Sequence, residues 1–404
     1  MRPALVLLAC WWLPLTGAAH AAGDAQAPSV IGGATASAGK WPDVAAILFP
    51  EITGDEPRCT GTLIAPTLVL TAGHCYDPGT FSLPDHVLIG ASSLARPGDG
   101  ETIAIARGFA YPDAATSKDV AVLVLARPSR RAPRALATGW ARLGIVNGAT
   151  VEVVGFGAIN ATGDEYVNEL QEAQTTITDF DCSSSVGCHA AARPAGELGA
   201  GGMGVDTCPG DSGGPLYLTT SHGAWLAGVT SRSYDDAQLA CSDGGIYERA
   251  DQVIDWIEAT TGVTVAHGPE PTAGTIAAVH GEGGDTRIRV NDPESDRHRF
   301  EITTPPAHGT ANVRDDGELR VCTDAAAAPG DDEVTVTIID SRRDGRALPI
   351  TVKIKIEAGS PPPVACDLNA FDSAGCCDTR RGGSGAVPLA LAVLAVARRR
   401  RRRA

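Results

Sequence analysis

Aromatic residues and long apolar runs are scarce in this chain. Phe, Trp and Tyr together make up 5% of the 404 residues, whereas glycine occurs 47 times. This balance favours β-structure with many turns over a helical bundle. The apolar stretch at residues 386–397 is shorter than the ~20 residues that span a bilayer comfortably.

Positive charge is also in deficit. The formal net charge is −15, although six arginines stand together at residues 398–403. So acidic a chain does not suit nucleic acid or an anionic membrane surface, and we expect no nucleic-acid partner. The 11 cysteines are scattered without paired C-x2-C spacing, which argues against a metal site. We therefore expect no metal and no cofactor.

Three residues in three separate motifs carry the groups for nucleophilic catalysis. His74 follows an apolar run, Asp119 precedes another, and Ser212 stands among glycines. A serine hydroxyl becomes an effective nucleophile only with a base, a group that orients the base, and donors for the oxyanion. Gly210–Gly214 also fits the α/β-hydrolase elbow, but that fold has its acid and histidine after the serine. The order His, Asp, Ser excludes it.

On these motifs the chain resembles the chymotrypsin/trypsin family of serine peptidases over about residues 30–262. The resemblance implies an all-β fold: two six-stranded antiparallel β-barrels with a closing C-terminal helix. The sequence predicts this helix over Asp251–Thr261, with Asp251 as its cap. It implies that His74 is the general base, that Asp119 orients it, and that Ser212 forms the acyl-enzyme. The N–H groups of Gly210 and Ser212 would form the oxyanion hole. The segments that carry the resemblance are Val30–Gly33, Thr71–Cys75, Asp119–Ala121 and Cys208–Pro215.

The resemblance also implies a primary specificity pocket. Asp206, six residues before Ser212, aligns with its base and would attract substrate Arg or Lys. If the loop at residues 189–205 shifts this alignment, the enzyme cuts after small or apolar residues instead. Arg232 stands where the family usually has tryptophan; it would favour acidic substrate residues or be neutralised by Asp235 and Asp236. The expected pocket walls include Ser231, which would also support Asp119, together with Arg232, Ser233 and Gly245.

The same resemblance implies that the protein is made as a zymogen, an inactive precursor that is cut to become active. Asp211 would be buried against the ammonium group of a freed Val30, and a buried carboxylate without a partner is costly. The bond to be cut is Ser29–Val30, and residues 22–29 contain no Lys or Arg. We therefore expect a separate activating peptidase.

The cysteines are disulfide candidates if the chain is exported. The resemblance pairs Cys59 with Cys75 and Cys208 with Cys241. A third pair, Cys182 with Cys188, would cross a short loop. The sequence does not decide whether Cys322 meets Cys366.

Seven segments are expected along the chain. They are a signal peptide (1–21), an activation propeptide (22–29), the peptidase domain (30–265), a linker (266–273), a small β-sandwich (274–358), a Pro-containing tether (359–374) and a C-terminal sorting signal (375–404). The sandwich resembles Ig-like or cadherin-like repeats. It either serves adhesion or substrate docking, with calcium at its acidic turns as an open alternative, or is a passive spacer. The tail resembles MYXO-CTERM sorting signals, with a weak membrane anchor as the alternative.

The expected protein is thus an exported, monomeric serine endopeptidase that acts on protein or peptide substrates containing Arg or Lys. It would be extracellular or anchored at the bacterial outer surface. The competing class is a surface adhesin whose peptidase-like domain is inactive, against which the full set of catalytic groups argues.

Overall fold

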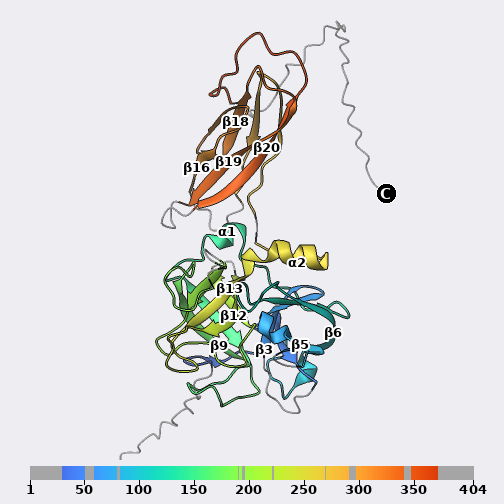
Figure 1. The fold of residues 1–404 in the computed structure, drawn as a ribbon, viewed down its shortest axis with the longest axis vertical. Helices are drawn as coiled ribbons and strands as arrows, with labels where there is room; N and C mark the ends of the chain where they lie inside the picture. Colours follow the sequence, from blue (N-terminus) through green and yellow to red (C-terminus); the bar gives the residue numbers. More distant parts are fainter. Residues whose placement is uncertain are drawn as a thin grey trace, which may run out of the picture.

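The computed structural model describes residues 30–50, 59–79, 82–189, 191–192, 196–220, 223–268, 270–290, 297–340 and 347–371. The expected signal peptide, propeptide and C-terminal sorting signal lie outside these residues. The fold is all-β, as predicted, with two closed barrels followed by further sheets (Figure 1).

The first barrel is built from strands whose apolar side chains fill its interior. Every residue of β3 is buried, and Leu63, Val69 and Leu123 belong to one core cluster. The strands follow the order β2–β3–β4–β7–β6–β5 around the closed barrel. Their bounds are β2 (Val44–Leu48), β3 (Cys59–Ala65), β4 (Leu68–Thr71), β5 (His86–Ile89), β6 (Glu101–Ala110) and β7 (Ala121–Leu125).

The second barrel closes through the pairing of β8 with β9, and β1 (Ala34–Thr35) is added on β9. The order around it is β9–β10–β13–β12–β11–β8. Its core contains Trp140, Val153, Leu216 and Tyr247. The bounds are β8 (Thr150–Gly155), β9 (Gln171–Asp179), β10 (Glu197–Ala200), β11 (Pro215–Thr220), β12 (Gly223–Ser233) and β13 (Gly245–Arg249).

Helices in the described residues are few and short. They are η1 (Gly73–Tyr76), η2 (Pro97–Asp99), α1 (Gly139–Arg142), η3 (Ala250–Gln252) and α2 (Ile254–Thr261). The expected closing helix is present, but its predicted cap, Asp251, is wrong: α2 begins after Val253, with no side-chain cap. The Asp251 carboxylate instead binds the guanidinium of Arg249 at 2.8 and 2.9 Å.

A buried polar cluster joins the two barrels. Asp43 precedes the first barrel, Tyr217 lies in β11 of the second, and Arg134 belongs to the segment between them. Arg134 donates to both carboxylate oxygens of Asp43 at 2.6 and 2.9 Å, and the Tyr217 hydroxyl donates to the same carboxylate at 2.5 Å. Such bidentate pairing satisfies charges that burial would otherwise penalise. The cluster therefore ties the barrels together.

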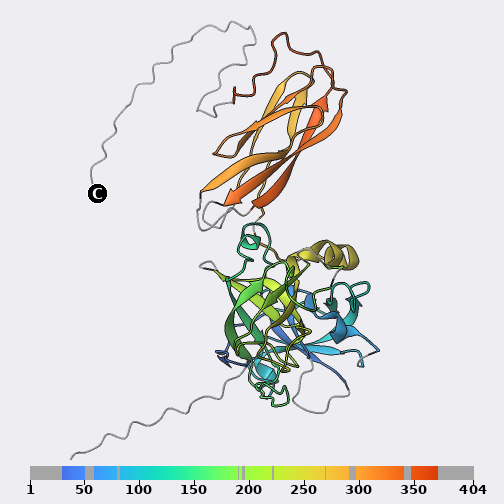
Figure 2. The same cartoon turned by 60° about the vertical axis from the view of Figure 1, so that its left-hand side comes forward.

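Two further sheets follow the barrels and pack on each other through a core that includes Ile276, Leu319, Val336 and Ile354. Figures 1 and 2 show them as a body beyond α1 and α2. One sheet has the order β14–β20–β19–β16 and the other β15–β18–β17. Their bounds are β14 (Ile276–Val279), β15 (Gly283–Arg287), β16 (His298–Thr304), β17 (Gly309–Val313), β18 (Glu318–Thr323), β19 (Gly330–Asp340) and β20 (Ala347–Glu357).

Among the described residues, no helix combines the length and apolar character that crossing a membrane requires.

Candidate active site

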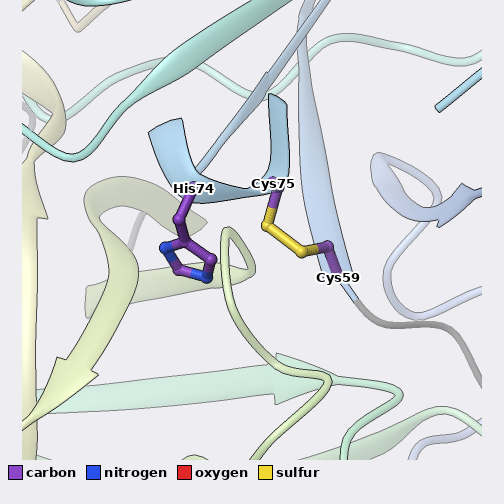
Figure 3. Close-up of side chains that lie close together, drawn as sticks. All are labelled: Cys59, His74 and Cys75. Carbon is purple, nitrogen blue, oxygen red and sulfur yellow. A yellow bond between two sulfur atoms is a disulfide. The ribbon is translucent and has the colours of Figure 1, made fainter. Parts of the chain in front are cut away.

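His74 lies in η1, one turn after β4 ends, and points away from the first barrel (Figure 3). Its Nδ1 lies 2.8 Å from Oδ2 of Asp119, and its backbone N–H donates to Oδ1 of the same carboxylate at 2.8 Å. Asp119 lies two residues before β7, whose first residues are buried. These two hydrogen bonds to one carboxylate fix the position of the imidazole and turn its Nδ1 toward Asp119. Nε2 is left to accept a proton.

Asp119 is buried, and both oxygens of its carboxylate take part in hydrogen bonds. The Ser231 hydroxyl donates to Oδ2 at 2.7 Å, as expected for its supporting role. Burial would raise the pKa of Asp119, but the hydrogen bonds and charge of His74, together with the bond from Ser231, outweigh it and hold the pKa below its ordinary value. Asp119 is thus ionised at neutral pH and can stabilise an imidazolium.

The Ser212 loop of the second barrel lies against the His74 segment of the first. Thr60 in β3 donates its backbone N–H to the Ser212 carbonyl at 2.8 Å. Sγ of Cys75, the residue after His74, lies 3.7 Å from the same carbonyl. Among described residues, the Ser212 hydroxyl makes no hydrogen bond to His74, and such contacts often tighten only when substrate binds.

Backbone donors around Ser212 point to a site for an oxyanion. Gly210 has φ of 100° and Gly213 has φ of 80°, values that favour glycine. The Pro209 carbonyl, on the same peptide as the Gly210 N–H, accepts from Ala158 N–H at 2.9 Å. Within the described part of the chain, the N–H groups of Gly210 and Ser212 donate to no protein atom.

Asp206 lies buried, 2% exposed, beneath the expected pocket wall. Its carboxylate accepts backbone N–H bonds from Thr207, Ser242 and Gly244 at 2.8 to 3.1 Å. Burial outweighs these bonds and raises the pKa of Asp206 to about 6. A Cβ placed on Gly245 would lie only 2.9 Å from the Arg232 carbonyl oxygen and 3.8 Å from Oδ1 of Asp206, so the close approach of the β12 backbone favours glycine at this position of the expected wall.

The structure corrects one expectation about Arg232. Its guanidinium is bound by Glu197 at 2.7 Å and faces Glu248 at 3.7 Å. The idea that Asp235 and Asp236 neutralise it is therefore wrong. Sequence reasoning missed Glu197 and Glu248, although a glutamate within the apolar run of β13 was a visible signal. The remaining wall residue, Ser233, is exposed.

Asp211 is fully buried and accepts N–H bonds from Gly157 and Cys208 at 2.8 and 2.9 Å. Burial raises its pKa to about 7. The Val30 side chain is 1% exposed and packs in the core of the second barrel. Among the described residues no basic side chain forms an ion pair with this carboxylate, and its hydrogen bonds come from backbone N–H groups.

Four disulfides are present among the described residues. Two join Cys59 with Cys75, beside His74 (Figure 3), and Cys208 with Cys241, beside the Ser212 loop. The others are Cys182–Cys188 and Cys322–Cys366. The last pair, which the sequence left undecided, joins β18 to the segment after β20.

Three groups of side chains in the described residues have the spacing of metal ligands. Two contain disulfide-bonded cysteines, which are not free to bind a metal. The third, His189 with Glu197 and Glu248, already surrounds the cationic guanidinium of Arg232.

Comparison of the sequence with known proteins finds serine peptidases over the part of the chain that forms the two barrels. The trypsin family model matches residues 30–257, more than half of the chain. The chain is 31% identical over 247 residues to transmembrane protease serine 11C of Mus musculus, a match that covers 58% of this chain and 54% of that protein. It is 31% identical over 245 residues to transmembrane protease serine 9 of Rattus norvegicus, covering 56% and 21%. It is 28% identical over 242 residues to chymotrypsin-like elastase family member 3B of Macaca mulatta, covering 57% and 93%. The chain thus spans about half of the first relative and about a fifth of the second.

Proposed function

The chain belongs to the trypsin family of serine peptidases, and from that premise we propose that residues 30–265 form an endopeptidase domain that cleaves after Arg or Lys. His74 takes the proton of Ser212 and returns it to the leaving amine. Asp119 holds the imidazole and stabilises its charge. The N–H groups of Gly210 and Ser212 bind the oxyanion, where one donor is worth about 100- to 1000-fold in turnover.

One observation carries this proposal: the ionised, buried Asp119 binds Nδ1 of His74 while the Ser212 loop is held against the next residue of the same turn. These groups come from separate barrels, and an inactive decoy has no physical need to bring them together. The competing role as an adhesin with an inert peptidase-like domain finds no comparable support.

The preference for a cationic side chain follows from Asp206. A buried carboxylate with only backbone N–H partners lacks a counter-charge, and a substrate guanidinium or ammonium supplies one. Arg232 is held by Glu197, so it exerts little pull on acidic substrate residues.

Activation follows from Asp211 and Val30. Cutting the Ser29–Val30 bond creates an ammonium group, which would pair with Asp211, a buried carboxylate held by the backbone N–H groups of Gly157 and Cys208. Because no Lys or Arg precedes this bond in residues 22–29, a separate peptidase makes the cut.

Export follows from the signal-like residues 1–21 and from the disulfides. The enzyme acts outside the cell as a monomer or is anchored at the bacterial surface by its tail at residues 375–404. Residues 274–358 form an Ig-like sandwich that serves as a spacer or a docking module.

The test uses the chain with Val30 as its first residue and a matched Ser212→Ala variant. We expect fluorophosphonate labelling and cleavage of Arg and Lys peptides by the first, and neither by the second. Cleavage after Ala or Phe would keep the mechanism and discard Asp206 as the pocket base. Folded protein without labelling or turnover would favour the adhesin.

A further inference from the structure

A pair of buried glutamates lies behind Asp119 and has no part in the reaction described above. Glu197 in β10 and Glu248 in β13 are direct cross-strand partners, 1% and 0% exposed. Like charges directly opposite each other destabilise a sheet, and burial adds to the cost. An arrangement this costly calls for a compensating group.

Arg232 in β12 supplies the compensation. Its Nη2 donates to Oε1 of Glu197 and to the Gly187 carbonyl, both at 2.7 Å. The backbone N–H of His189 donates to the other Glu197 oxygen at 2.7 Å. The guanidinium is therefore clamped in one orientation, and its charge is balanced mainly by Glu197, its nearer carboxylate.

Glu248 contributes a hydrogen bond but no charge. Burial and the charge of Glu197 raise its pKa to about 9, so it is protonated at neutral pH. Its Oε1 accepts the backbone N–H of Asp119 at 2.9 Å. Glu248 thus holds the main chain at Asp119 without placing a second negative charge beside it.

The clamped guanidinium reaches the catalytic pair through one hydroxyl. Nη1 of Arg232 lies 3.0 Å from the Ser231 Oγ, which lies 2.7 Å from Oδ2 of Asp119. Arginine can only donate hydrogen bonds. The Ser231 oxygen must therefore accept from Arg232, and its single hydrogen is left for Asp119.

We propose that Arg232 is a positioning residue for the catalytic pair: clamped by Glu197, it fixes the Ser231 hydroxyl hydrogen on Asp119 and so holds that carboxylate on His74. This inference rests on the proposed peptidase function. The charged and titratable groups that face Asp119 are His74 from η1, Arg232 from β12 and Glu248 from β13, with Glu197 and His189 behind Arg232.

The sign of the electrostatic effect follows from these groups. Arg232→Met removes a cation, leaves Glu197 unbalanced and frees the Ser231 hydroxyl to turn away from Asp119. The first two changes make protonation of His74 easier, so its titration moves to higher pH, by roughly half a unit. Loss of the fixed hydrogen bond lowers kcat about tenfold.

The experiment follows the His74 imidazole by NMR titration in the Ser212→Ala protein, which needs no turnover, and measures kcat with Ser212 present. Glu248→Gln is the matched control. Glu248 is already neutral, so this replacement should leave the titration of His74 unchanged. Adding Glu197→Gln to the Glu248→Gln variant removes the carboxylate that neutralises Arg232. The His74 titration should then move to lower pH, which is opposite to the effect of Arg232→Met. Opposite shifts cannot arise from a fold that is merely loosened.

A double-mutant cycle supplies the second readout. In a Ser231→Ala background, Arg232→Met should lower kcat by less than about twofold, because the hydroxyl through which it acts is gone. Unchanged His74 titration in Arg232→Met, or full additivity with Ser231→Ala, would overturn the inference even in an active enzyme. An inactive wild type with the expected NMR shifts would instead reject the proposed function and keep the positioning contact.

Discussion

The Thr60 hydroxyl donates a hydrogen bond to the Gly210 carbonyl at 2.9 Å, across 150 residues of sequence. The same oxygen lies 3.4 Å from Phe156 N–H, and the Thr60 N–H binds the Ser212 carbonyl. One fully buried side chain in β3 therefore holds the loop that carries both proposed oxyanion donors.

Thr60→Val should lower kcat about tenfold with little change in KM, because it leaves the Gly210 carbonyl without its buried donor while keeping the shape of the side chain. Thr60→Ser keeps the hydroxyl and should retain most of the activity. Steady-state kinetics on an Arg peptide compare the two. Equal kcat in Val and Ser variants would show that the loop holds its position without this bond.

Binding of a cationic arginine mimic should weaken as pH falls below about 6. With the pKa of Asp206 at about 6, the carboxyl is protonated below that pH and offers the cation no charge. Kd should then rise about tenfold per pH unit. Inhibitor titration of the Ser212→Ala protein measures this without interference from His74-dependent turnover.

The control for that titration is an uncharged inhibitor of similar size, whose Kd should not follow this profile. A second control is Asp206→Ser, which should lose about 100-fold or more in affinity for the cation at pH 8. A Kd for the cation that stays constant from pH 8 to pH 5 would remove Asp206 from the pocket.

Stability of the uncut chain should fall as pH rises from about 4 to about 7. The pKa of Asp211 is raised to about 7 in the folded protein, whereas in the unfolded chain it lies near 4. Between these values the folded state holds a proton that the unfolded state has released, so unfolding becomes easier at up to about 1.4 kcal/mol per pH unit. Thermal unfolding of the uncut Ser212→Ala chain across this range measures the slope.

Asp211→Asn in the same background should flatten part of that slope, and the remainder should reflect Asp206 and Glu248, whose raised pKa values act in the same direction. Cutting at Ser29–Val30 should remove the contribution of Asp211, since an ammonium group then stabilises the ionised carboxylate. Identical slopes before and after cutting would contradict the ion pair.

Asp43→Ala should destabilise the protein by about 3 to 5 kcal/mol, because it leaves the mostly buried guanidinium of Arg134 without its carboxylate. The contrasting variant is Asp316→Ala, which breaks an exposed pair with Arg287 and should cost less than about 1 kcal/mol. Denaturant unfolding compares them. A small effect at Asp43 would mean that water enters and solvates Arg134.

The two barrels could be predicted only through the family resemblance that the motifs carry. His74, Asp119 and Ser212 could be singled out from the sequence itself, because each stands beside an apolar strand or a glycine turn that leaves a local signal. Thr60 has no such local signal, because it is one polar residue in an apolar strand and its partners are far away in sequence. Glu197, Glu248 and Arg232 meet only when β10, β12 and β13 pair side by side. Asp251 failed as a cap because a stronger partner, Arg249, stands two residues before it.

The division of the site between two barrels makes the relative position of the barrels part of the proposed chemistry. His74 and Asp119 belong to the first barrel, whereas Ser231 and the loop that holds Gly210 and Ser212 belong to the second. Neither barrel alone therefore holds both the base and the nucleophile. A substitution at the buried contacts between the barrels, far from any bound peptide, can move one group relative to the other and so change turnover.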